Sequence, residues 1–531
     1  MVWTTWNFEL FFSEKECSIR PLAARGSQSP RRPGLLVRED DNTQEGKGKG
    51  GRAFVMSAGW AVCGNFADFA ALPSVVLVEI YKHLSFEDRL RASSTCRAWR
   101  ECLFHPRFWT SLTVRLGRKR NKWRRAEFLG RKCGRFVRHF ELEFDCSSGQ
   151  IVSQCIAVLT LLGDNRQLAS LSLRPTACVV AWPLCSCGGS RANGCAANEN
   201  ETVAVYDRFV EAIRQVIRTS VSLEHLSLGC LEDLVLQSDS LLALLALHQR
   251  RSLRQLHLAS AKEDPDHYPI PEVRLRRLQS LERLSTLGVD YDYVCDQLLL
   301  LLGEQTQLLS LVLHVHGLDD RQRVCDRSWE ELRRSCPRLR VTLVLLHTCE
   351  SLSTVRSVLS PAMPLRDFRS YFSEGFRGEV LDVLSARYAE TLQTVAVVNA
   401  LSEGQSTPRR TFAVRAESPV VMLAWRCHQL GSLQLVGHEI ADTDVIAIAR
   451  LRGSQLKELM VPADCVSESS GGPYYSELRP SDVRLLEAEV SSSLLRTWTL
   501  STLRSPAQSE TGQTRSYLRT LQQLQSYGGS A

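Results

Sequence analysis

The 531-residue sequence lacks the long apolar runs and the charge excess that mark several classes of protein. No stretch approaches the roughly 18 consecutive apolar residues of a membrane-spanning helix. The first residues place acidic side chains around a short aromatic run, so we expect no secretory signal peptide. A net charge of +7 is small for this length and does not by itself indicate nucleic acid or acidic lipid. We expect a cytoplasmic or nuclear protein that makes no contact with membranes.

The chain also lacks any pair of cysteines separated by two residues, although it holds 18 cysteines. Such pairs are typical of structural zinc sites, and their absence argues against an intrinsic RING ligase. Cys178, Cys185, Cys187 and Cys195 share one Gly/Ser/Asn-rich segment, but their spacings do not match the usual zinc ligands. We predict free thiols in a flexible insert there, and no metal site or cofactor anywhere in the chain.

No motif for catalysis is complete. The segment GKGKGG near residue 50 lacks the full phosphate-loop spacing and the strand that should precede it. Cys427 and His428 are neighbours, and neighbours on a helix point about 100° apart, so they cannot align as nucleophile and base. The sequence therefore predicts a protein that is not an enzyme.

A short helical module follows a leader, residues 1–69, whose composition predicts mostly disorder. Val76, Ile80 and Leu84 are spaced as one apolar stripe of a helix that starts near Leu72-Pro73. Ser85 and Asp88 have the spacing of a capping box and predict a second helix. Cys96, Trp99 and Leu103 mark one face of a third. Three helices in about 40 residues bury little core, so their apolar faces need a partner.

The rest of the chain repeats the hexapeptide L-x-x-L-x-L. Clear copies begin at Leu168, Leu223, Leu253, Leu308, Leu430 and Leu456, and looser ones at Val137, Leu281, Leu339 and Leu392. Most start-to-start steps are 26 to 38 residues, whereas the steps from Leu168 and Leu339 are 55 and 53 and predict a degenerate or looped-out repeat.

One short strand and one apolar helix per unit are typical of a leucine-rich repeat solenoid. The alternative is an ordinary leucine-rich α/β domain, whose strands would have no reason to keep one repeat length. We predict an α/β fold in four parts: the leader, a helical module at 70–112, a solenoid at 113–498 with a disordered insert near 178–202, and a flexible polar tail at 499–531.

The helical module resembles an F-box. The resemblance rests on the Leu72-Pro73 start, on Ile80, Leu84 and Leu90, on the run from Cys96 to Arg100 that contains Trp99, and on Trp109. Val75 departs from the pattern, because many F-boxes carry an acidic residue there. Segments 127–144, 420–430 and 446–461 also resemble a member of the F-box family that carries leucine-rich repeats.

The resemblance implies that the chain binds a Skp-family adaptor, which joins it to a cullin scaffold and a RING subunit. The residues expected to contact the adaptor are Leu72, Pro73, Ile80, Leu84, Leu90, Cys96, Trp99 and Trp109. It further implies a substrate-recognition subunit of a Skp-cullin-F-box ubiquitin ligase, which presents proteins for ubiquitination and proteasomal degradation. The alternative is a noncatalytic repeat scaffold in which the helices only cap the solenoid.

The residues between the leucines of each hexapeptide are expected to face the open side of the sheet, since side chains alternate along a strand. The positions expected to contact substrate are Arg174, His225, Gln255, His257, Arg283, His314 and Gln434. The face is largely uncharged and has no cluster of arginines, so we hypothesise recognition without a phosphate group.

A basic segment lies between Arg115 and Arg138, where Glu127 is the single acidic residue. Three interpretations remain open: a solvated helix face with Phe128 and Leu129 buried, a site for an acidic protein, or a nucleic-acid site. Nucleic acid is the least favoured of these, because the positive field is local and salt screens it within about 8 Å.

Overall fold

The structure is a computed structural model that describes residues 69–117, 120–180, 199–305, 307–317, 324–348, 351–373, 375–399, 412, 417–469 and 478–501. The described residues fall into two compact units, one ending at His105 and the other beginning at Pro106. The predictions of disorder for residues 1–68, 181–198 and 502–531 lie outside the described residues. No described helix is long and apolar enough to cross a membrane.

The first unit contains a short 3-10 turn and three helices: η2 (Phe69–Ala71), α1 (Ser74–Lys82), α2 (Phe86–Ser93) and α3 (Arg97–Leu103). The capping box is confirmed, because the Ser85 hydroxyl accepts from the Asp88 backbone N–H and donates to its carboxylate. The buried side chains of α1 are Leu77, Val78 and Tyr81. Val76 is 42% exposed, so the predicted apolar stripe lies beside the face that is buried within this unit.

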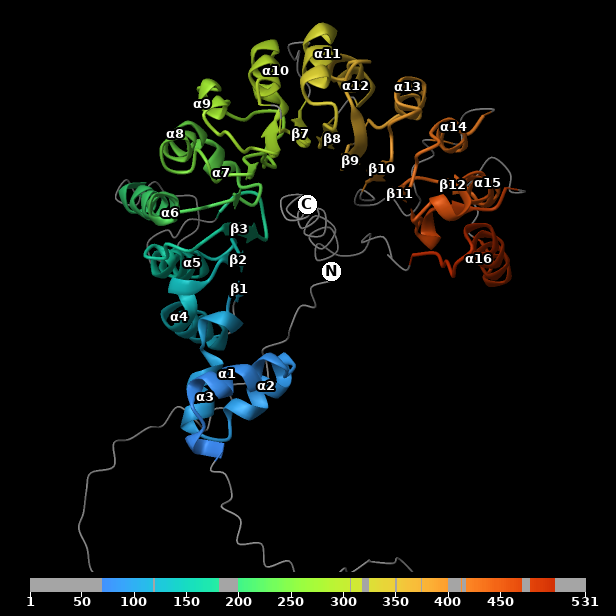
Figure 1. The fold of residues 1–531 in the computed structure, drawn as a ribbon. Helices are drawn as coiled ribbons and strands as arrows, with labels where there is room; N and C mark the ends of the chain where they lie inside the picture. Colours follow the sequence, from blue (N-terminus) through green and yellow to red (C-terminus); the bar gives the residue numbers. More distant parts are fainter. Residues whose placement is uncertain are drawn as a thin grey trace, which may run out of the picture. The chain divides into compact units, whose positions relative to one another are not determined.

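The second unit is a solenoid around one twelve-stranded parallel sheet (Figure 1). Its strands are β1 (Ser111–Leu116), β2 (His139–Phe144), β3 (Ser170–Pro175), β4 (His225–Ser227), β5 (Gln255–His257), β6 (Thr286–Asp290), β7 (Ser310–His316), β8 (Arg340–Leu346), β9 (Leu365–Tyr371), β10 (Thr394–Val398), β11 (Ser432–Val436) and β13 (Glu458–Met460). They follow one another in sequence order across the sheet, which confirms the leucine-rich repeat fold class.

Helices line the outer side of this sheet (Figure 1). They are α4 (Arg120–Cys133), α5 (Gly149–Leu162), α6 (Glu199–Thr219), α7 (Glu232–Val235), α8 (Ser238–His248), α9 (Arg276–Gln279), α10 (Asp296–Gly303), α11 (Asp326–Ser335), α12 (Ser351–Val358), α13 (Glu379–Arg387), α14 (Pro419–Arg426), α15 (Asp442–Arg452) and α16 (Pro480–Leu494). A two-stranded pair, β12 (Ile440–Ala441) with β14 (Val466–Ser467), completes the unit.

The core of the solenoid is a leucine ladder that the hexapeptide creates. Leu171, Leu226, Leu256, Leu287 and Leu311 are paired from strand to strand and have no exposed surface. Burying each such side chain contributes about 1.5–3 kcal/mol. Because the ladder fixes which strand face turns inward, the alternate residues face the open side of the sheet.

The two long repeat steps have different causes. β3 pairs directly with β4, so the first long step adds no strand to the sheet and contains α6. The second contains β9, whose sequence LRDFRSY is a degenerate repeat that pairs with β8 and β10. A register irregularity at Val341/Thr342 accompanies it.

The structure corrects the repeat predicted at Leu281. The residue paired with Leu256 is Leu287, so that repeat begins at Leu284, three residues later. Leucines occupy both registers of this segment, and the hexapeptide alone cannot distinguish them. Arg283 is therefore outside β6, contrary to its predicted place on the strand face.

Some predicted boundaries also differ from the structure. Cys178 is buried with Cys230 in one apolar cluster and is not part of a flexible insert, and α6 already begins at Glu199. At the carboxyl end Leu500 is buried and Ser501 pairs with Pro462, so the ordered chain passes the predicted limit of 498. Phe128 is 36% exposed although it was predicted to be buried with Leu129.

Candidate functional site

The first unit carries an apolar surface at its amino-terminal end. Phe69, Val75 and Val76 are 67%, 78% and 42% exposed, and Leu72 and Ile80 beside them are partly exposed. We call these five residues the apolar face. They lie on and around the start of α1, whose opposite side packs inward through Leu77 and Tyr81. An exposed apolar patch on a small module marks a site for a partner.

Hydrogen bonds within the first unit fix this face. The indole Nε1 of Trp99 donates to the Phe69 carbonyl at 2.9 Å, and the Tyr81 hydroxyl donates to the Trp99 carbonyl at 2.8 Å. Arg89 Nε donates to the Tyr81 carbonyl at 2.8 Å. The three bonds tie η2, α1, α2 and α3 together, so a partner would meet a preorganised surface.

Most of the predicted adaptor contacts are accessible. Pro73 is exposed, and those partly exposed are Leu72, Ile80, Leu84, Leu90, Cys96 and Trp99. Trp109 is different, since it lies in the second unit and is only 4% exposed. Its buried ring offers almost no surface to a partner, which contradicts its predicted role as an anchor. Phe69 was missed because the predicted module began at residue 70.

The open side of the sheet carries paired charges on its first strands. Arg115 on β1 contacts Glu143 on β2 at 2.5 Å, and Arg174 on β3 contacts Glu141 on β2. Thr113 also donates to Glu141. The charges on adjacent strands therefore neutralise one another. Arg174 lies on the open face and is paired there with the Glu141 carboxylate.

Three predicted substrate contacts are histidines, and two of them have little solvent access. His225 is half-buried, and His257 and His314 are 8% and 2% exposed. Burial lowers the pKa of His225 to about 4, of His257 to about 3 and of His314 to about 4. All three are neutral at pH 7, because removal from water disfavours the imidazolium.

The remaining predicted contacts are spread over several environments. Gln255 on β5 is partly exposed, whereas Gln434 is 5% exposed and donates to Glu458 Oε1 at 2.9 Å. Arg283 lines a cavity of about 300 Å³ at the edge where β4 and β5 begin, together with Arg251 and Arg254. Arg174, His225 and Gln255 are thus the predicted residues that offer accessible surface on the strands.

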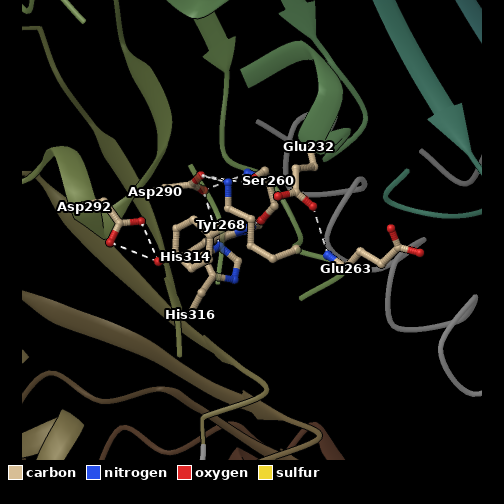
Figure 2. A network of polar contacts seen from close by, with 9 residues as sticks. Glu232, Ser260, Glu263, Tyr268, Asp290, Asp292, His314 and His316 are labelled. Atoms are coloured by element: carbon tan, nitrogen blue, oxygen red, sulfur yellow. Dashed lines mark hydrogen bonds and ion pairs between the residues drawn. The ribbon is translucent and has the colours of Figure 1, made fainter. Parts of the chain in front are cut away.

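A buried polar network covers the carboxyl ends of β5 to β7 (Figure 2). The Asp290 carboxylate accepts from the Ser260 backbone N–H at 2.8 Å and from the Ser260 hydroxyl at 2.6 Å. Lys262 Nζ lies 3.4 Å from the same carboxylate, and the Ser260 carbonyl lies 2.7 Å from His314 Nδ1. These contacts hold the segment after β5 across the neighbouring strands. The hexapeptide gave no signal for this network, since Ser260 and Lys262 lie beyond the repeat.

The basic segment contains the end of β1, the helix α4 and the 3-10 turn η4 (Gly134–Phe136). Arg124, Arg131 and Lys132 of α4 are exposed, and Arg131 pairs with Glu127 at 2.8 Å. Leu129 is buried beneath them. The helix thus presents a solvated basic face.

Comparison with known proteins agrees with this architecture. Residues 69–115 match the F-box-like family model. The chain is 28% identical over 488 residues to F-box only protein 33 of Mus musculus, covering 82% of this chain and 84% of the relative. The Homo sapiens protein of that name is also 28% identical, over 484 residues. F-box/LRR-repeat protein 21 of Mus musculus is 21% identical over 443 residues, covering 81% of this chain and 89% of the relative.

These matches confirm the resemblance to the F-box family. A solved structure, the yeast complex of Rad7 and Elc1, aligns with a TM-score of 0.36 and 16% identity over 77% of this chain and 89% of that chain. Members of the F-box family are generally substrate adaptors and not enzymes.

Proposed function

We propose that this protein is the substrate-recognition subunit of a Skp-cullin-F-box ubiquitin ligase, located in the cytoplasm or the nucleus. The observation that carries the proposal is the apolar face on an F-box-like module, linked to a long solenoid that offers a separate binding surface. The two parts match the two tasks of a receptor, which are to join the ligase and to hold a substrate.

The apolar face has the chemistry of an adaptor site. Its side chains are aliphatic or aromatic and come from η2, from Leu72 just before α1, and from the first two turns of α1. Docking would remove them from water, and central anchors in such interfaces contribute about 2 kcal/mol or more each. A Skp-family adaptor with a complementary apolar groove is the partner that this face fits.

Catalysis would be positional. A bound substrate lysine is held near the ubiquitin thioester that the cullin-bound RING subunit delivers, which raises its effective concentration. The chain itself then supplies no acid, base or nucleophile. Proteasomal degradation of the substrate is the consequence that we expect.

Substitutions on the apolar face test the proposal. We expect the double variant Leu72→Asp/Val76→Asp to lose more than 30-fold in affinity for the adaptor, because about 2 kcal/mol corresponds to that factor. A matched control is Leu247→Asp, since Leu247 is 73% exposed on α8 in the second unit. Both proteins are compared by titration with purified adaptor and by circular dichroism.

The outcomes separate the two candidate functions. Loss of adaptor binding in the double variant alone, with both variants folded, supports the receptor. If the unsubstituted chain fails to bind adaptor, or if the double variant binds as tightly as the control, the helices are no adaptor site and the noncatalytic scaffold is favoured.

A further inference from the structure

Two histidines and a carboxylate lie close together at the carboxyl ends of β6 and β7. His314 and His316 are two residues apart on β7, so both rings lie on the same face of the strand. Asp290, the last residue of β6, pairs in register with His314. One ligand atom from each of the three residues lies within 4.8 Å of the others, and all three side chains are buried.

The two histidines leave nitrogen lone pairs available. Nδ1 of His314 lies 2.7 Å from the Ser260 carbonyl and must carry the proton to donate to it. Its Nε2 is then an acceptor. His316 has no exposed surface, yet neither ring nitrogen has a hydrogen-bond partner. A buried imidazole that makes no hydrogen bond costs free energy, which a bound cation would recover.

The carboxylate of Asp290 is fixed by contacts with Ser260 and Lys262. Ser260 donates its hydroxyl to Oδ2, and Lys262 Nζ lies 3.4 Å from the same oxygen. Oδ1 accepts from the Ser260 backbone N–H at 2.8 Å and lies 3.5 Å from His316 Nε2. That separation is close to the ligand–ligand distance of about 3.3 Å in a tetrahedron with bonds of about 2.0 Å. The lysine therefore sits on the outer oxygen, where an outer-shell partner would orient the ligand.

We propose that Asp290, His314 and His316 form a binding site for a divalent transition metal, with zinc as the representative ion (Figure 2). Two imidazoles and one carboxylate suit zinc, cobalt, nickel or iron(II), whereas calcium and magnesium prefer oxygen ligands alone. Three protein ligands leave one coordination position for water. Ser260 and Lys262 supply the outer shell from the segment after β5.

Bound metal would fasten that segment to the sheet. Tyr268 packs its ring 5.8 Å from the His316 ring and 4.6 Å from Lys262 Nζ, so the same segment covers the proposed site. The inference does not depend on the proposed ligase function, because it rests on contacts within the second unit alone.

Titration of the full chain with Co²⁺ and Zn²⁺ tests the site. A chelator first removes any bound metal from the protein, and the chelator is then removed before the titration. We expect one Co²⁺ per chain, visible d–d absorption without the intense near-ultraviolet bands of thiolate ligands, and displacement by Zn²⁺. Zinc should also raise the midpoint of thermal unfolding, since a ligand that binds only the folded state stabilises it.

Variants assign the binding to these residues. His314→Gln/His316→Gln should weaken Zn²⁺ binding by more than the ~100-fold that loss of an outer-shell partner can cost. The control His225→Gln/His257→Gln removes two histidines from neighbouring strands and should bind as the unsubstituted chain does. Ser260→Ala, a milder change that keeps the backbone contacts, should weaken binding about 10-fold.

Three results would overturn the site. The first is failure of the unsubstituted chain to bind Co²⁺ or Zn²⁺ at micromolar concentration. The second is a thiolate absorption spectrum, which would assign the metal to cysteines. The third is a Zn²⁺ affinity that is unchanged both in Ser260→Ala and in His314→Gln/His316→Gln.

Discussion

Trp99 holds the amino-terminal turn of the first unit through its indole, whose Nε1 donates to the Phe69 carbonyl at 2.9 Å. Phe69 is 67% exposed, so its position depends on this bond more than on burial. The bond connects the start of α3 with the apolar face 30 residues earlier in the chain. Trp99 therefore acts both as a partly exposed contact and as a support for its neighbours.

Replacing Trp99 by phenylalanine should separate these two roles. Trp99→Phe keeps an aromatic ring but removes the donor, so we expect adaptor affinity to fall about 5- to 10-fold, near the ~1 kcal/mol of a typical hydrogen bond. Titration with purified adaptor measures the change. Unchanged affinity would show that the bond to Phe69 plays no part in docking.

Trp109 should behave as a core residue. It is 4% exposed in the second unit, so Trp109→Ala is expected to lower the free energy of unfolding by about 3–5 kcal/mol. Adaptor affinity of the protein that remains folded should stay unchanged. Chemical denaturation and adaptor titration of the same sample measure both quantities, and a binding defect in fully folded protein would restore Trp109 as a contact.

The buried histidines make stability depend on pH. The pKa of His257 is lowered to about 3 and that of His225 to about 4, below the unfolded value of about 6.5. Below pH 6.5 the unfolded chain binds protons that the folded chain cannot, so stability falls as pH falls toward 4 and is insensitive to these groups above 6.5. His257 alone contributes up to about 1.4 kcal/mol per pH unit in that window.

Denaturation between pH 7 and 4.5, in the presence of a chelator, measures this dependence. The slope should be shallower in His225→Gln/His257→Gln than in the unsubstituted chain. His248→Gln is the matched control, because His248 is exposed. Identical slopes in all three proteins would contradict the account.

Gln255 is a predicted substrate contact with accessible surface, since it is partly exposed on β5 and lies on the open side of the sheet. Gln255→Ala should deplete a subset of copurifying proteins at least severalfold, whereas Gln297→Ala on the outer helix α10 should not. Phosphatase treatment should leave that subset bound. Quantitative mass spectrometry of affinity-purified samples is the measurement; phosphatase-sensitive binding would shift attention to Arg251, Arg254 and Arg283 around the cavity.

Several features were predictable from the sequence because a single physical rule controls each of them. The capping box at Ser85 and the leucine ladder through Leu226 and Leu256 follow from local hydrogen bonding and from period-two alternation. The register near Leu281 was not predictable, because leucines satisfy both frames. The burial of Trp109 was missed since a short motif cannot tell an exposed tryptophan from one in the neighbouring core.

The polar network around Asp290 was beyond prediction for a different reason. Ser260 and Asp290 are 30 residues apart, and what joins them is the path of the segment after β5 across the strands. No local pattern encodes that path. Histidines on an expected substrate face were therefore interpreted as contacts, whereas the covering segment places His314 in the interior.

The central claim is that residues near the amino-terminal end of the described chain join the protein to a ubiquitin ligase. The most direct test is quantitative affinity purification of the intact chain and of a chain lacking residues 70–112. The account predicts that Skp-family adaptor, cullin and RING subunit copurify with the intact chain and disappear with the deletion, while substrate proteins remain. Equal recovery of adaptor and cullin from both chains, or their absence from the intact one, would contradict it.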